Sequence, residues 1–177
     1  FDAHPNVNIP MECQFIVDLH GRYSRIKSWS KKDIESFLEA LKKVMFFDAW
    51  TIDTDMLKKA LFSQRDLLDY ALVCKNVIYH YQSFFKKDEI LLLGDKNPGY
   101  TIYTQKLLNI FPEAKFIFIN RDYRDNYLSL KRVDFELPFL SMVTYKWKHF
   151  FKEALKAKQR YPNKFYFINY EKLVNSP

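Results

Sequence analysis

Three short apolar runs, each ending in a polar cluster, constrain the fold of this chain more than any other feature of its sequence. They cover residues 90–94, 115–120 and 165–170, and stretches with apolar residues at helical spacing separate them. Buried strands that alternate with helices are typical of an α/β domain with a largely parallel sheet. The pattern therefore predicts that fold class.

Each apolar run is followed at once by polar or charged residues. The three clusters read Asp95-Lys96-Asn97-Pro98, Asn120-Arg121-Asp122 and Tyr170-Glu171. Because ligands of parallel sheets bind beyond the carboxyl ends of the strands, we expect these clusters to converge. The sequence thus predicts an anion site built from Lys96, Arg121 and nearby hydrogen-bond donors.

The net charge of +7 lies in the second half of the chain. Residues 1–95 carry 13 Lys+Arg and 14 Asp+Glu, a net of −1, whereas residues 96–177 carry 15 and 7, a net of +8. This asymmetry indicates an anionic ligand or surface, and a solvated basic face is the alternative.

Composition excludes several other classes of protein. An apolar fraction of 48% excludes a disordered chain, and no apolar run approaches the roughly 20 residues of a membrane span. Two cysteines, Cys13 and Cys74, are too few for a disulfide framework or a four-ligand zinc site. We expect both to be buried thiols.

Two capping-box patterns predict helices ahead of the first apolar run. Ser30 with Asp33 opens the first, and Ser63 with Asp66 opens the second. Residues 14–88 are therefore expected to form a helical subdomain.

The remaining segments complete the expected order of elements. Residues 1–13 are interpreted as a polar loop, and residues 89–177 as the α/β part. Helices are expected over residues 100–110, 124–132 and 137–160.

Four stretches of the sequence carry a recognisable pattern. The most specific is a strand followed by Arg121-Asp122-Tyr123-Arg124-Asp125 and then Ser129. The other three are Asp2-Ala3-His4-Pro5 through Glu12, Asp95-Lys96-Asn97-Pro98, and Asn169-Tyr170-Glu171-Lys172-Leu173-Val174. Together they resemble the sulfotransferases that use 3′-phosphoadenosine 5′-phosphosulfate (PAPS), and most closely the branch with tyrosylprotein and many bacterial sulfotransferases.

The resemblance implies a three-layer P-loop NTPase-like α/β domain over residues 1–177, with a largely parallel central sheet and a helical insertion. In the family, a Gly-Thr-Thr-like phosphosulfate loop precedes the Asp-Ala-His-Pro segment, and a basic, glycine-containing loop follows Tyr-Glu-x-Leu. Neither stands in this sequence, so we expect a domain truncated at both ends. The implied function belongs to the parent protein, and this piece alone could be inert. Tyr123 also departs from the Pro or Gly that is usual there.

The resemblance also implies cofactor-binding residues. Arg121 and Ser129 would hold the 3′-phosphate of PAPS, and Tyr170 would meet its adenine. An arginine offers a planar fork of donors to phosphate, and a tyrosine can stack on a base. The alternatives are a structural ion pair of Arg121 with Asp122 or Asp125, and a core position for Tyr170.

Two residues are implied to act in the transfer itself. Glu12 would take the proton of the acceptor hydroxyl, and Lys96 would neutralise charge on the transferring group. His4 is the rival base, because cytosolic small-molecule sulfotransferases use a histidine, but we interpret it as structural. Trp147 is expected in the core of a long helix, and Glu171 is expected to cap or pair locally.

The resemblance therefore implies an enzyme that moves a sulfuryl group from PAPS to an acceptor hydroxyl by in-line transfer, with no metal. The acceptor (a protein tyrosine, a carbohydrate or a small molecule) is left open, as is a homodimer.

Two alternatives stay open. One is a noncatalytic nucleotide- or anion-binding module, and the other is a small kinase-like transferase, for which a Walker-type lysine loop is missing. No nucleic-acid partner is expected, because the sequence holds no reader motif. The Phe-, Lys- and Tyr-rich composition favours a bacterial cytoplasmic protein over one of the Golgi lumen.

Overall fold

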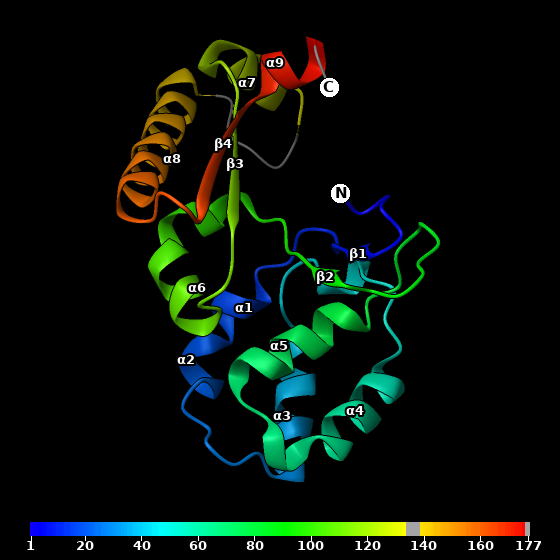
Figure 1. Ribbon diagram of the computed structural model, residues 1–177. Helices are drawn as coiled ribbons and strands as arrows, with labels where there is room; N and C mark the ends of the chain where they lie inside the picture. Colours follow the sequence, from blue (N-terminus) through cyan, green and yellow to red (C-terminus); the bar gives the residue numbers. More distant parts are fainter. Residues whose placement is uncertain (134–138, 176–177) are drawn as a thin grey trace. The chain divides into compact units, whose positions relative to one another are not determined.

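A computed structural model describes residues 1–133 and 139–175 of the chain. The chain divides into two units, Phe1–Gly99 and Tyr100–Pro177. Each unit holds one pair of parallel strands together with several helices (Figure 1). The protein is thus a mixed α/β structure with short parallel strands, which is the fold class that the sequence predicts. The described strands form two separate pairs and not the one largely parallel sheet that was expected.

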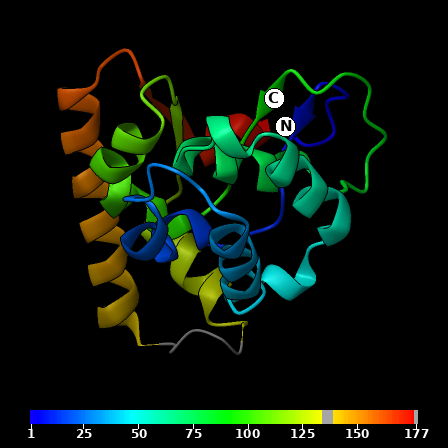
Figure 2. The same cartoon turned by 90° about the horizontal axis from the view of Figure 1, so that it is seen from below.

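The first unit contains several helices, and α3 packs against α4 and α4 against α5 (Figures 1 and 2). The helices are α1 (Phe15–Asp18), α2 (His20–Tyr23), α3 (Lys31–Leu41), α4 (Thr54–Ser63) and α5 (Tyr70–Tyr79), with short 3-10 turns at Phe47–Ala49 and Arg65–Leu67.

One of the two predicted helix starts is confirmed and the other is wrong. The Ser30 hydroxyl accepts from the Asp33 N–H at 3.1 Å, and the Asp33 carboxylate accepts from the Ser30 N–H at 2.9 Å, which completes the capping box of α3. Ser63 instead ends α4, and the caps of α4 and α5 are Asp53 and Asp69. Aspartate caps a helix as well as serine does, so the S-x-x-D spacing alone could not choose between them.

The first unit also contains a strand that the sequence did not reveal. Strand β1 (Val7–Asn8) lies in the predicted loop and pairs in parallel with β2 (Leu92–Leu93). A two-residue strand is too short to show alternation. Leu91 and Leu92 are 69% and 62% exposed, so the first apolar run is not covered on both faces.

Asn8 anchors this strand pair to α5. The buried side-chain amide of Asn8 donates to the carbonyls of Ile78 and Tyr81, at 2.9 and 3.0 Å. The main-chain carbonyl of Asn8 accepts from the Gly94 N–H at 3.0 Å. A Cβ at Gly94 would lie 2.8 Å from the Ile9 Cγ1, so the segment after β2 needs glycine to approach β1 so closely.

Cys13 and Cys74 are buried free thiols, as predicted. Burial raises the pKa of Cys13 to about 12 and raises that of Cys74 as well. Both thiols are therefore protonated at neutral pH and serve packing.

The second unit is built on β3 (Phe116–Asn120) and β4 (Phe165–Asn169), which pair in parallel along their whole length. Helix α8 (Leu140–Arg160) packs along one face of the pair (Figure 1). There its alanines meet the phenylalanines of both strands: Ala154, Ala157, Phe116, Phe118, Phe165 and Phe167. Ile117 and Ile119, on the other face, are 48% and 53% exposed.

Three shorter helices complete this unit, namely α6 (Thr104–Ile110), α7 (Tyr123–Leu130) and α9 (Tyr170–Asn175). Helices α7 and α9 follow the carboxyl ends of β3 and β4 (Figure 1). All three helices that the sequence predicted between residues 100 and 160 are present, with ends shifted by a few residues. The expected start at residues 137–138 lies outside the described residues.

Asp2 ties the N-terminal segment to the residues that precede β2. Its carboxylate accepts from the Ser83 hydroxyl at 2.6 Å, the Ile9 N–H at 2.9 Å and the Lys87 ammonium at 3.0 Å. Lys87 also donates to the Val7 carbonyl at 2.6 Å. Burial raises the pKa of Asp2, but these hydrogen bonds outweigh it and hold the pKa below its ordinary value of 3.8.

We predict that Asp2→Asn lowers the free energy of unfolding by about 1–2 kcal/mol at neutral pH, because hydrogen bonds to a charged acceptor are lost. Since the folded pKa lies below the unfolded value of 3.8, this stabilisation is present above pH 3.8 and is lost as the pH falls through the folded pKa. Urea denaturation at stepwise lower pH measures the difference. Asp88→Asn, at an exposed position, is the control. The prediction is contradicted if the difference in free energy of unfolding between wild type and Asp2→Asn does not become smaller in acid.

Candidate functional site

Glu12 and Lys96 form an ion pair in the first unit. The Lys96 Nζ lies 2.9 Å from the Glu12 Oε2, and the two side chains are 64% and 41% exposed. Glu12 precedes α1 and Lys96 follows β2, so two segments far apart in the sequence bring them together. A carboxylate and a cation thus lie at hydrogen-bond distance from each other, and both are exposed to solvent.

The backbone on both sides of Glu12 is held by side chains. The indole N–H of buried Trp50 donates to the Met11 carbonyl at 2.9 Å, and the Asn97 amide donates to the Cys13 carbonyl at 3.2 Å. The main chain of Glu12 is therefore fixed while its carboxylate stays accessible. Sequence reasoning missed Trp50, because a donor 39 residues away leaves no local signal.

His4, the rival base, lies in the exposed turn ahead of β1. Its Nδ1 accepts from the Asn6 N–H at 3.2 Å, and the Lys87 ammonium donates to its carbonyl at 3.4 Å. Both contacts shape the turn.

In the second unit, Arg121 and Tyr170 meet at the carboxyl ends of β3 and β4. Because Asn120 pairs with Asn169 in the last register position, the next residue of each strand continues side by side. The Arg121 Cζ lies 4.8 Å from the centre of the Tyr170 ring, a cation–π contact. Two of the three polar clusters thus converge, whereas Lys96 belongs to the first unit.

Arg121 has no acidic partner among residues 1–133 and 139–175. Asp122, the alternative partner, accepts instead from Arg124, with Nε at 3.0 Å from Oδ1 and Nη2 at 2.7 Å from Oδ2. The Arg124 guanidinium lowers the pKa of Asp122 to about 2. The Arg121 Nε is buried without an acceptor in the described structure, so its cation is not neutralised by the protein around it.

The whole chain matches one known protein family. The model of the sulfotransferase family matches residues 1–177. The chain belongs to the sulfotransferase family. No curated protein and no solved structure matches it. Membership supports a transferase that moves sulfuryl groups, and it confirms the family that the sequence motifs indicated.

Ser129 of this sulfotransferase lies in the last turn of α7, and it is exposed. Within the described part of the chain its hydroxyl makes no hydrogen bond, to Arg121 or to any other residue. The structure therefore leaves the hydroxyl available, but does not bring the two side chains into direct contact.

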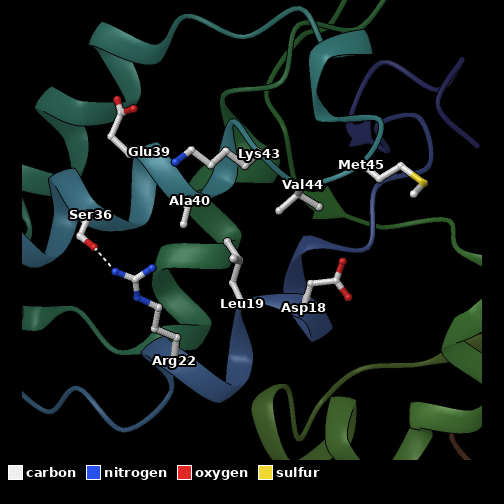
Figure 3. A pocket seen from close by; sticks show the side chains of 9 residues that line it. All are labelled: Asp18, Leu19, Arg22, Ser36, Glu39, Ala40, Lys43, Val44 and Met45. Carbon is white, nitrogen blue, oxygen red and sulfur yellow. Dashed lines mark hydrogen bonds between the residues drawn. The ribbon is translucent and has the colours of Figure 1, made fainter.

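Each unit of the sulfotransferase contains an open pocket among its described residues. A pocket of about 460 Å³ lies beside α2 and α3, where Arg22 donates to the Ser36 hydroxyl at 3.0 Å and burial raises the pKa of Asp18 (Figure 3). No residue that the sequence predicted for the site lines it. A pocket of about 530 Å³ in the second unit is lined by residues that precede and follow Tyr170 in the chain, but not by Tyr170 itself: Phe167, Ile168, Asn169, Glu171, Lys172, Leu173 and Asn175.

In the part of the chain that the structure describes, no group of three or more His, Cys, Asp or Glu side chains is arranged to hold a metal ion. Among the same residues, no helix combines the length and the apolar character that crossing a membrane requires.

We predict that Lys96→Met changes the free energy of unfolding by less than about 1 kcal/mol, because exposed ion pairs contribute little. The matched variant Lys87→Met removes a lysine whose ion pair with Asp2 is only 13% and 21% exposed. It should cost about 3 kcal/mol or more, since it leaves a shielded carboxylate without its cation. Urea denaturation of both variants measures the contrast, and equal losses would contradict it.

Proposed function

We propose that this sulfotransferase transfers the sulfuryl group of PAPS to a hydroxyl-bearing acceptor by in-line displacement. The observation that carries the proposal is the Arg121 guanidinium, which lies 4.8 Å from the Tyr170 ring and has no acidic partner among the described residues. A planar cation beside an aromatic face suits a nucleotide that carries a phosphate close to its base.

Under this proposal the second unit recognises the donor. Arg121 binds the 3′-phosphate through its outer nitrogens, and Ser129 adds a hydroxyl donor from the last turn of α7. Tyr170 stacks on or hydrogen-bonds to the adenine.

Residues of the first unit carry out the transfer. PAPS supplies the sulfuryl group, whose sulfur bonds to the acceptor oxygen as its bond to the nucleotide phosphate breaks. Glu12 accepts the proton that the acceptor hydroxyl loses. Lys96 neutralises the negative charge on the transferring group, so this step uses a protein cation and no metal. Their ion pair at 2.9 Å supports the assignment, because it holds base and cation together.

The proposal extends to the architecture and the acceptor. We take residues 1–177 as one P-loop NTPase-like sulfotransferase domain, with a helical part at 14–88 and a cofactor-binding part at 89–177. The parallel strand pairs support this fold. A glutamate in the place of the base favours the tyrosylprotein and bacterial branch, with a protein tyrosine, a carbohydrate or a small hydroxyl compound as acceptor.

We predict that Arg121→Ala in the full-length protein weakens binding of 3′-phosphoadenosine 5′-phosphate more than tenfold, because a hydrogen bond to a charged group is worth about 1.5–3 kcal/mol. Isothermal titration calorimetry measures the affinity. Arg160→Ala is the matched control, since Arg160 also stacks on a tyrosine, Tyr161, at 5.4 Å.

A second ligand sharpens this test. Adenosine 5′-phosphosulfate lacks the 3′-phosphate, so it should bind more weakly and lose little when Arg121 is replaced. Equal affinity of wild type and Arg121→Ala for the bisphosphate removes the cofactor assignment. Similar binding of both nucleotides favours a kinase-like transferase instead.

We predict that Glu12→Gln lowers turnover by about 100-fold or more at saturating PAPS, the scale of a lost general base, and leaves cofactor affinity nearly unchanged. The amide keeps the shape of the side chain but cannot accept the proton. His4→Ala should mainly reduce stability. Near-normal turnover of Glu12→Gln, with collapse in a stably folded His4→Ala, would assign the base to His4.

A further inference from the structure

Two side chains hold the peptide bond between Arg121 and Asp122 from its opposite ends. The indole N–H of Trp147 donates to the Arg121 carbonyl at 2.9 Å. The Glu171 carboxylate accepts from the Asp122 N–H at 2.8 Å through Oε1. Because a peptide group is planar and carries one donor and one acceptor, these two contacts fix its orientation.

Trp147 and Glu171 are themselves held in place by neighbouring residues. Trp147 lies on α8, and its ring stacks on Phe151 with centres 5.1 Å apart and planes within 8°. The second oxygen of Glu171 accepts from the side-chain amide of Asn169, the last residue of β4, at 2.7 Å. The hydrogen bond from the Asp122 N–H is the main reason that the pKa of Glu171 is lowered, so Glu171 acts as an ionised acceptor at neutral pH. The peptide is thus tied to both α8 and β4.

This peptide sets the direction of the Arg121 side chain. Arg121 lies between the end of β3 and the start of α7, and the described residues offer its guanidinium no salt bridge to hold it in place. The ring of Tyr170 supports the head group through a cation–π contact. The orientation of the Arg121 guanidinium must therefore also depend on the main chain from which its side chain extends.

We propose that Trp147 and Glu171 are positioning residues of this site, which fix the Arg121–Asp122 peptide and so direct the guanidinium at the phosphate of the nucleotide. This inference rests on the proposed function and deepens it. Neither residue needs to touch the nucleotide for this role.

The charge of Glu171 allows a test, because a positioning role and a charge effect predict opposite changes in the affinity for the nucleotide. Acting only through its charge, a carboxylate close to an anion site would repel the nucleotide, so Glu171→Ala and Glu171→Gln would both tighten binding. A positioning role predicts the opposite for Glu171→Ala. The amide oxygen of Glu171→Gln can still accept from the Asp122 N–H, so this variant should restore most of the affinity.

The experiment measures binding of 3′-phosphoadenosine 5′-phosphate by calorimetry on the full-length protein. Glu171→Ala and Trp147→Phe should each weaken it about fivefold, the size of one lost hydrogen bond, and Glu171→Gln should stay within about twofold. Trp147→Phe keeps an aromatic ring against Phe151 and removes only the indole donor. Glu153→Ala is the control, since it removes an equivalent charge whose partner is Lys156 on the same helix.

Kinetics separate positioning from a general loss of structure. In Glu171→Ala and Trp147→Phe the KM for PAPS should rise while kcat at saturation stays close to wild type. A merely structural role would lower kcat through a smaller active fraction and leave KM unchanged. In an Arg121→Ala background, Glu171→Ala should add less than about a twofold effect, because it acts through that side chain.

Each outcome bears on one claim or on both. Unchanged affinity in Glu171→Ala and Trp147→Phe, with Arg121→Ala still weakened, overturns the positioning role alone. Tighter binding in both Glu171 variants overturns it in favour of a charge effect. Full affinity in Arg121→Ala overturns the proposed function, and the positioning role with it.

Discussion

The parallel register between β3 and β4 is the constraint on which the second unit depends. Five residue pairs, ending with Asn120 opposite Asn169, carry the two strands to the same edge. The next residues are then Arg121 and Tyr170, so their contact follows from backbone pairing rather than from any attraction between them. The phenylalanines that face α8 stabilise the same register, since a slip by one residue would move them to the opposite face.

The two units hold the backbone at their proposed functional residues in the same way. Trp50 donates to the carbonyl before Glu12, and Trp147 donates to the carbonyl of Arg121 itself. In both places a rigid indole fixes the main chain, and the charged head group keeps its hydrogen-bonding capacity. Under the proposed function, fixing the backbone in advance lowers the entropic cost of binding, and the indole does not neutralise the charged group.

The sequence predicted what depends on local pattern and on topology. Strand β3, helix α7 and the meeting of Arg121 with Tyr170 followed from periodicity and from the rule for parallel strands. Contacts across long separations could not be predicted, because an indole that reaches a carbonyl 26 or 39 residues away leaves no spacing to detect. Glu171 was expected to pair locally, and it also reaches Asp122, 49 residues away.

The pairing of Asp122 with Arg124 has a consequence for how the Arg-Asp-x-Arg motif can vary. Arg124 occupies both oxygens of the carboxylate that stands next to Arg121 in the chain. Losing Arg124 alone would release an anion beside the Arg121 cation, which the proposed function needs free, and losing Asp122 alone would leave α7 without its cap. We therefore expect positions 122 and 124 to covary among related chains.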